Sequence, residues 1–229
     1  MRALIRYQVA LLLRSHRWIP PAVLFALGVV GLGDVRQPLG GGLASGLSWA
    51  ALMLVPAVAW LTRSMLTAEP PEARACVAAA GGPWRVQIAA LIAALVVGAV
   101  FGLAGVAWEL FSAGVVRTLG THAIEVGATF RVVVGGLLAG LICLLVASAI
   151  GALSNPPVIR RPGAAMLITT AAVVASLAWD ISPANAALRS PGTGVRGSSW
   201  PPGVPLAASV VLLVVAWSVS GYFAARRDG

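Results

Sequence analysis

The side chains that most often catalyse reactions or bind metals are few in this 229-residue sequence, and they lie far apart. The only cysteines are Cys76 and Cys143, and the only histidines are His16 and His122. Neither pair has the spacing of a zinc site, and two such cysteines do not make a disulfide framework. We therefore predict no catalytic residue and no metal site in the chain.

All sixteen Lys and Arg residues are arginines, since the sequence contains no lysine. A P-loop requires a lysine on the nucleotide phosphates, and a Schiff-base enzyme requires a lysine amine. We therefore expect no Walker site, no bound cofactor and no enzymatic activity of the chain's own. The net charge of +9 could indicate a nucleic-acid partner. The arginines flank apolar segments instead of clustering on one wetted face, so we expect no nucleic acid.

The composition is typical of a membrane protein. Hydrophobic residues make up 59% of the sequence and charged residues only 10%, against about half and about a quarter in soluble domains. Six stretches contain no Asp, Glu, Arg or His and are long enough, or nearly so, to span a bilayer. They are residues 18–33, 43–62, 86–108, 132–153, 163–179 and 204–225, of which the first and fifth are the shortest. We predict one all-α membrane domain over residues 1–229, with six transmembrane helices within 18–225 and a tail at 226–229.

The distribution of arginines predicts the orientation, because cytoplasmic connections carry the excess of positive charge. With the N-terminus inside, eleven arginines face the cytosol and five face outward, so we expect both termini in the cytosol. The inner set is Arg2, Arg6, Arg14, Arg17, Arg63, Arg74, Arg85, Arg160, Arg161, Arg226 and Arg227, and the outer set is Arg36, Arg117, Arg131, Arg189 and Arg196.

The segment 1–17 has the pattern of an amphipathic helix that lies in the membrane interface. On a helical wheel its four arginines fall within an arc of about 120°, opposite leucine and isoleucine side chains. Such a helix would bind membrane lipids through its arginines. The alternative is a signal peptide, which the lack of a convincing A-x-A cleavage site disfavours. The four arginines are Arg2, Arg6, Arg14 and Arg17.

The stretch between the second and third spans, residues 62–85, contains the signals of a short helix. An acidic and proline-rich start at 69–72 is typical of a helix N-terminus. Gly81, Gly82 and Pro83 would end a helix that covers 73–80. Such a helix, held by two membrane helices, could dock a cytosolic partner, whereas the alternative interpretation is a solvated loop.

Two further patterns concern the spans and the outer side. Glycines four residues apart allow membrane helices to approach closely, which indicates internal packing or a dimer seam at Gly98, Gly102, Gly136 and Gly140. The segment 180–203 is rich in Pro, Ser and Gly and is predicted to be irregular. The acids Glu109, Glu125 and Asp180 are expected at the outer rim, either solvated or paired with arginines.

Three stretches resemble the permease subunits of type-2 ATP-binding cassette exporters, of the compact kind common in high-GC bacteria. They are the run at 73–92 (ARACVAAAGGPWRVQIAALI), the run at 181–188 (ISPANAAL), and the terminal Arg226-Arg227-Asp228. The layout of an interfacial helix, six spans and a short helix between spans two and three extends over the full chain. Each motif is short and degenerate, so the resemblance depends on their order and spacing.

The resemblance implies a permease in the bacterial cytoplasmic membrane that dimerises with an identical or related chain. Each copy would dock a separate cytosolic ATPase subunit, which would bind the ATP and magnesium. Segment 1–17 would be the elbow helix and 69–84 the coupling helix. The residues implied to contact the ATPase are Arg63, Glu69, Glu72, Arg74, Val77 and Arg85. The substrate does not follow from the family.

Three other function classes compete with a permease. An intramembrane enzyme would need activated polar residues, and the predicted spans contain only Ser, Thr, Gln87 and Cys143 as candidates. A secondary transporter or channel usually has an ionisable residue near the bilayer midplane, which the six stretches lack. These alternatives, together with a structural or assembly factor, are separated from a permease by the presence of a partner ATPase.

The predicted topology can be tested by cysteine labelling. On a cysteine-free background, a cysteine at position 198 should react with a membrane-impermeant reagent added outside the cell. A cysteine at position 74 should react only from the inside, because the connection at 62–85 is predicted to be cytosolic. The reverse labelling pattern would show that the topology is inverted.

Overall fold

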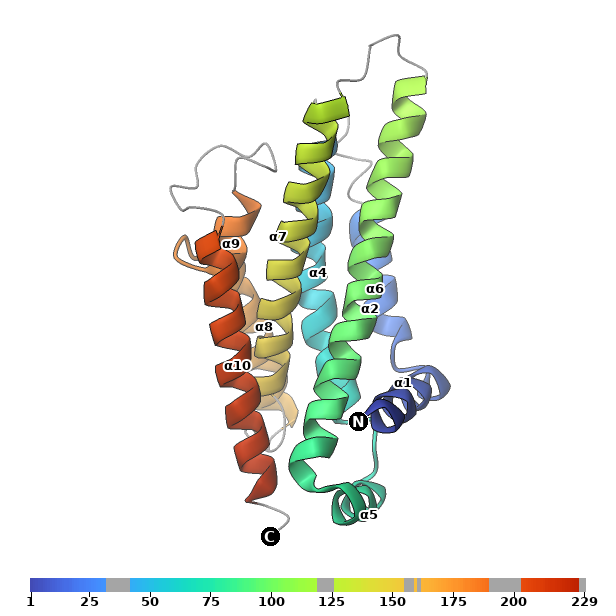
Figure 1. Ribbon diagram of the computed structural model, residues 1–229, viewed down its shortest axis with the longest axis vertical. Coiled ribbons are helices and arrows are strands. Elements are labelled where there is room, and N and C mark those ends of the chain that lie inside the picture. The colour runs from blue at the N-terminus through green and yellow to red at the C-terminus, as the bar shows by residue number, and fades with distance from the viewer. Residues whose placement is uncertain (32–41, 119–125, 155–158, 160–161, 190–202, 227–229) are drawn as a thin grey trace.

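The chain forms a bundle of helices. The computed structural model describes residues 1–31, 42–118, 126–154, 159, 162–189 and 203–226, and within these ranges there are helices and no strands. The elements, shown in Figure 1, are α1 (Arg2–Ser15), α2 (Ile19–Ala26) with its π-helical continuation η1 (Leu27–Gly31), α4 (Leu43–Leu66), α5 (Pro71–Gly81), α6 (Pro83–Thr118), α7 (Val126–Leu153), α8 (Pro162–Ala178), α9 (Pro183–Leu188) and α10 (Gly203–Ala225).

Four helices are long and apolar enough to cross a membrane. They are Leu43–Leu66, Pro83–Ser112, Phe130–Leu153 and Gly203–Ala224. They contain almost all of the predicted spans 43–62, 86–108, 132–153 and 204–225. The prediction of an all-α, multi-pass membrane protein is therefore confirmed at this coarser level.

The predicted spans 18–33 and 163–179 correspond to shorter apolar helices, Ile19–Gly31 and Gly163–Ala178. At 1.5 Å per residue these helices are about 20 and 24 Å long, whereas the hydrocarbon layer is about 30 Å thick. Residues 32 and 33 of the first predicted span lie outside the described residues.

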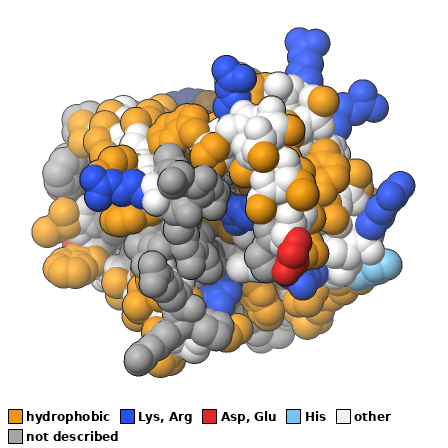
Figure 2. Space-filling view, turned by 90° about the horizontal axis from the view of Figure 1, so that it is seen from below, with side chains coloured by type: hydrophobic (Ala, Val, Ile, Leu, Met, Phe, Trp, Pro, Cys, Tyr) orange, Lys and Arg blue, Asp and Glu red, His pale blue; other side chains and the backbone are white. Residues whose placement is uncertain are grey.

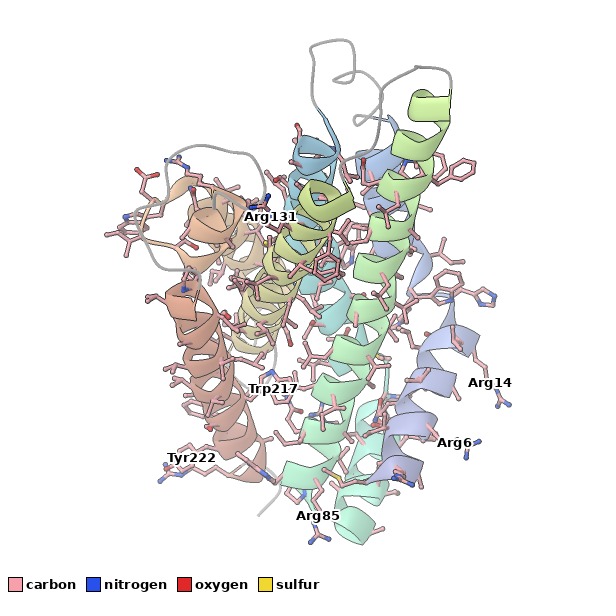
Figure 3. The ribbon with its side chains drawn as sticks, turned by 45° about the horizontal axis from the view of Figure 1, so that its top comes forward. Arg6, Arg14, Arg85, Arg131, Trp217 and Tyr222 are labelled. Atoms are coloured by element: carbon pink, nitrogen blue, oxygen red, sulfur yellow. The ribbon has the colours of Figure 1, made fainter. Side chains whose placement is uncertain are left out.

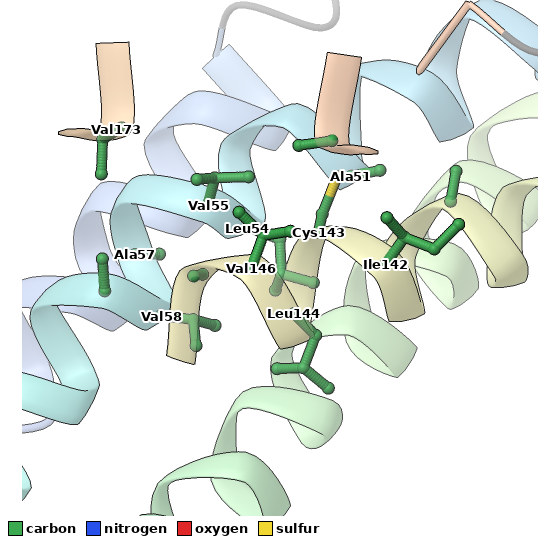
Figure 4. Close-up of a cluster of buried hydrophobic side chains, with 14 of the residues drawn as sticks. Ala51, Leu54, Val55, Ala57, Val58, Ile142, Cys143, Leu144, Val146 and Val173 are labelled. Carbon is green, nitrogen blue, oxygen red and sulfur yellow. The ribbon is translucent and has the colours of Figure 1, made fainter. Parts of the chain in front are cut away.

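The core of the bundle lies between α4 and α7. Figure 4 shows Val55, Val58, Cys143 and Val146 among its buried side chains, and Phe25 of α2 stacks on Phe101 of α6 at the edge of the same cluster, with 5.9 Å between ring centroids. Many of the other core residues are alanines. Since lipid is as apolar as these side chains, close packing of small residues stabilises helix contacts in a membrane.

Three of the four glycines predicted to pack helices do so within the chain. A Cβ at Gly98 would lie 2.7 Å from Leu144, one at Gly102 would lie 3.4 Å from Leu54, and one at Gly136 would lie 2.8 Å from Leu47. These positions are contacts of α6 and α7 with each other and with α4. Gly140 has no such neighbour within 4 Å, so only this glycine presents an open surface.

The far end of the bundle differs from the sequence-based prediction at Glu109. The residue was expected at the outer rim, solvated or paired with arginines; α6 continues through it to Thr118, and its side chain is buried, so it is not a solvated rim charge. Its carboxylate lies against Gly46, in the first turns of α4, where a Cβ would overlap it. The positive end of a helix dipole stabilises a nearby carboxylate, so this site accommodates the charge that was expected to end the span.

The expectation of an irregular segment at 180–203 was wrong for residues 183–188, which form α9. Pro183 occupies the first turn, and the Asn185 side chain donates a hydrogen bond of 2.6 Å to the carbonyl of Leu177 at the end of α8. Asp180 is exposed and forms an ion pair of 2.9 Å with Arg189, a surface contact that contributes little stability.

Several residues of the predicted connections and tail lie outside the described ranges. They are Asp34, Arg36, Glu125, Arg160, Arg161, residues 190–202 with Arg196 and the label position Ser198, and residues 227–229.

The contrast between Gly136 and Gly140 gives a matched test of the α4 and α7 packing. Gly136→Ala should destabilise the protein by about 1–3 kcal/mol, because the new methyl group would overlap Leu47. Gly140→Ala should be neutral or stabilising by up to about 1 kcal/mol, because alanine is the better helix former. Thermal unfolding in detergent measures the difference, and equal midpoints for the two variants would contradict this packing.

Candidate docking site at the α5 end of the bundle

A short transverse helix and the ends of longer helices meet at one end of the bundle. α5 lies across this end between the last turn of α4 and the first turn of α6, while α1 and the end of α10 lie close by (Figure 1). Figure 2 views this end directly: arginine side chains project from its rim, and acidic side chains cover only a small part of the face. The surface is therefore positively charged around a small helix.

Local sequence explains why α5 forms and where it ends. Pro71 lies in the first turn, where its missing N–H is no loss, and Glu72 adds a negative charge near the helix N-terminus. Gly82 follows the last turn with a φ of 83°, a left-handed conformation that glycine adopts without strain. The helix includes the predicted residues 73–80 and extends them to Pro71 and Gly81.

Arg74 is the centre of a hydrogen-bond network inside this end. Its Nη1 donates to the carbonyl of Leu66 at 3.1 Å, and its Nη2 donates to Oε1 of Gln87. Nε2 of Gln87 then donates to Oγ of Ser220 at 2.8 Å, and both of these residues are fully buried. One chain of bonds thereby joins α5 to α4, α6 and α10.

A second contact joins the start of α6 to α10. Gly221 of α10 has no room for a Cβ, because the indole of Trp84 lies directly on its backbone. Trp84 keeps 43% of its surface exposed. The side chain therefore packs against α10 on one side and remains available at the surface on the other.

The turn before α5 is held by α1. The Tyr7 hydroxyl donates to Oε1 of Glu69 at 3.0 Å, and Gln8 contacts the other carboxylate oxygen at 3.5 Å, the upper limit for a hydrogen bond. Arg17 donates to the carbonyl of Thr67 at 2.6 Å. The hydrogen bond from Tyr7 to the Glu69 carboxylate raises the pKa of the Tyr7 phenol, because it stabilises the neutral form.

The buried side of α1, which includes Gln8, is anchored in the bundle. Leu12 is fully buried and packs with Leu61 and Met65 of α4 and with two alanines of α6. The arginines predicted for an interfacial helix lie elsewhere: Arg2, Arg6 and Arg14 are exposed, and Figure 3 shows Arg6 and Arg14 directed away from the bundle. Arg17 is exposed as well, but it also holds the turn at Thr67.

The predicted docking residues fall into three groups. Glu72 and Arg85 are exposed, and Figure 3 shows Arg85 directed outward from this end. Arg63 and Val77 are partly buried. Glu69 and Arg74 instead bind neighbouring helices of the same chain.

Sequence reasoning did not identify Gln87, Ser220 and Tyr7 as members of this site, and it included Trp84 only as the last residue of the implied coupling helix 69–84. Gln87 did carry a signal, because an amide in an apolar run must find a hydrogen-bond partner in lipid. The identity of that partner could not be read from the sequence, since Ser220 is 133 residues away.

Comparisons of the chain with protein-family models, with curated proteins and with solved structures give no match. Among the described residues there is also no cluster of three or more His, Cys, Asp or Glu side chains that could hold a metal ion.

The bond between Tyr7 and Glu69 can be tested by tyrosine titration. The sequence has two tyrosines, so Tyr222→Phe leaves Tyr7 as the only tyrosine whose ionisation the ultraviolet absorbance reports. We expect an apparent pKa above the ordinary value of 10.0. Only the neutral phenol can donate this hydrogen bond. The bond is therefore present below pH 10 and is lost as the pH rises through the raised pKa of Tyr7.

Adding Glu69→Gln to this variant should return the pKa of Tyr7 toward 10, because the carboxylate that stabilises the neutral phenol is removed. Glu72→Gln is the matched control, since Glu72 is an exposed acid on the neighbouring helix, whereas the hydrogen bond of Tyr7 goes to Glu69. If both substitutions shift the titration equally, the effect is one of net charge and the hydrogen bond is not its cause.

Proposed function

We propose that the chain is the permease subunit of an ATP-driven exporter in the bacterial cytoplasmic membrane. In this proposal six helices cross the bilayer, two permease chains form the pathway, and α5 docks a separate ATPase subunit on the cytosolic side. The order of the sequence stretches at 73–92, 181–188 and 226–228 supports it, together with an end of the bundle that is built around a short transverse helix.

The observation that carries this proposal is the position of Arg74. A motor protein can move membrane helices only through a contact that does not yield. A helix attached by its two chain connections alone would swing freely, but the Arg74 guanidinium binds α5 to α4 and α6, and through Gln87 to α10. A displacement of α5 is thus transmitted to three membrane helices at once.

The outer face of α5 fits a partner that approaches closely. Its exposed residues are small or charged: Glu72, Ala75, Cys76, Ala79 and Ala80. Small side chains allow a helix to lie deep in a groove, and Glu72 and the neighbouring Arg85 supply one charge of each sign for orientation. We assign this face, with Arg85 and Trp84 beside it, as the contact with the ATPase.

Six spans are proposed because the two shorter apolar helices follow the alternating course of the four long ones. α2 leaves the α5 end and α4 returns to it, and α8 and α10 form the corresponding pair (Figure 1). The described ends of the chain, in α1 and α10, consequently lie at the same end. The two shorter helices, Ile19–Gly31 and Gly163–Ala178, can span a locally thinned bilayer, at a cost of fractions of a kcal/mol per Å of mismatch.

One observation favours the alternative of an ion-coupled carrier. Glu109 is a buried acid inside the candidate span Pro83–Ser112, and such residues often bind transported ions. The residue lies near the end of that span and beside the first turns of α4, whereas coupling sites lie near the midplane. We therefore assign it a structural role at the helix terminus.

The proposal is tested by co-expression with the ATP-binding subunit encoded beside its gene, followed by co-purification and ATPase assays in vesicles. Reversing the exposed charges with Glu72→Lys and Arg85→Glu should weaken binding by about tenfold or more, which corresponds to about 1.4 kcal/mol. Arg74→Gln should leave binding intact and remove the effect of the permease on ATP hydrolysis, because Arg74 lies behind the docking face.

Arg131→Glu is the matched control, since this exposed arginine belongs to α7 at the opposite end of the bundle. It should change neither binding nor hydrolysis. If the neighbouring ATPase fails to co-purify with the unmodified chain, or if reversal of both exposed charges leaves its affinity unchanged, the proposed docking role of α5 is wrong.

A further inference from the structure

α1 presents a charged outer surface that no acid of the described chain neutralises. Arg2, Arg6 and Arg14 are exposed along one side of the helix. Leu13, 52% exposed, lies among them and adds an apolar side chain to the same surface. An apolar residue surrounded by outward arginines is the pattern of a helix that lies at the boundary between headgroups and acyl chains.

The chemistry of this surface fits phosphate-bearing lipids. A guanidinium binds phosphate oxygens through two parallel hydrogen bonds, and the long arginine side chain reaches the headgroup level from a helix that lies deeper. Phosphatidylglycerol and related anionic lipids carry a net negative charge, which the three arginines complement. Zwitterionic lipids offer the same phosphate without the net charge, so the surface should prefer the anionic kind.

A neighbouring side of the same helix holds the turn that leads into α5. The Tyr7 hydroxyl and the Glu69 carboxylate bond across this contact, and Arg17 binds the carbonyl of Thr67 two residues earlier. Tyr7 lies next to Arg6 in the sequence. A force on the arginines therefore reaches the start of α5 through a single turn of helix.

We propose that α1 binds the headgroups of anionic phospholipids and thereby, through the hydrogen bond from Tyr7 to Glu69, holds α5 against the bundle. The inference rests on the proposed function only for the importance of α5; the lipid contact and the link to α5 are properties of this chain alone. Lipid favours the seated position of α1, and by linkage it favours the seated position of α5 to the same extent.

Ala78 provides the probe, because it is buried on the inner face of α5 with 6% exposure. A cysteine placed there by Ala78→Cys can react with a water-soluble maleimide only when α5 leaves the bundle. Cys76→Ser removes the exposed natural cysteine, and Cys143 stays unreactive because it is fully buried. The purified chain is reconstituted without any ATPase in vesicles of phosphatidylcholine, with or without one third phosphatidylglycerol.

We expect phosphatidylglycerol to slow the reaction at position 78 by about fivefold, the factor that corresponds to one net hydrogen bond. Arg6→Gln with Arg14→Gln should remove this dependence. Tyr7→Phe should give the fast rate in both kinds of vesicle, because lipid still binds α1 but no longer acts on α5. Glu69→Gln is a second variant that tests the hydrogen bond between Tyr7 and Glu69, and the same result is expected.

The controls use the same kinds of substitution elsewhere. Tyr222→Phe removes a tyrosine hydroxyl from the end of α10, and Arg131→Gln removes an arginine from the opposite end of the bundle; both should keep the full lipid dependence. Inorganic phosphate added to phosphatidylcholine vesicles should not slow the reaction, since the proposed ligand is a membrane surface. If free phosphate does slow it, the site binds a soluble anion and the lipid assignment is overturned.

The proposal would be overturned if the Ala78→Cys protein with Tyr7 and Glu69 unchanged reacted at equal rates in the two kinds of vesicle. Full lipid dependence in Tyr7→Phe would overturn it as well. Neither result concerns an ATPase. Conversely, failure of the neighbouring ATPase to bind would refute the proposed function and leave the lipid effect on position 78 intact. The two ideas can therefore fail separately.

Discussion

The end of the bundle that contains α5 depends on one guanidinium group. Arg74 supplies donors to a helix-end carbonyl at Leu66 and to the amide of Gln87. Both acceptors need these bonds. The last carbonyls of α4 have no hydrogen-bond partner within their own helix, and a buried amide cannot form a hydrogen bond with water instead. Without this side chain the ends of α4 and α6 would each lose a partner, and Gln87 would be left with Ser220 alone.

The remainder of the bundle obeys a different constraint, which is close approach of backbones without a solvent-driven attraction. Glycine and alanine meet this constraint along α4, α6 and α7, where residues such as Gly136 leave space for the larger side chain on the facing helix. Polar bonding is concentrated at the α5 end, and small-residue packing fills the centre. This division allows the bundle core to be stable while the end that would meet a partner is held by a few specific bonds.

The sequence predicts those parts of the fold that depend on local composition. Runs without charge identify the four long helices, and proline and glycine mark both ends of α5. Contacts between distant segments were not predictable: Arg74 was expected to face a partner, but its direction is decided by Gln87 and Leu66. Glu109 was expected to end a span because a charge normally does so, and the first turns of α4 provide a place for it that only the fold creates. The helix α9 was missed for a similar reason, since its alanines become buried only when the other helices surround them.

The junction between α5 and α6 consists of one residue, Gly82. α6 continues without interruption for 36 residues, which is a rod of about 54 Å. A short arm and a long arm that share a single pivot act as a lever, so a rotation of about 5° at the pivot would carry the far end of the rod through about 5 Å. Mechanical advantage of this kind requires that the rod be stiff and that the two arms turn together, and the hydrogen bond from Arg74 to Gln87 joins them. Under the proposed function, a small movement of α5 would become a larger one at the far end of α6.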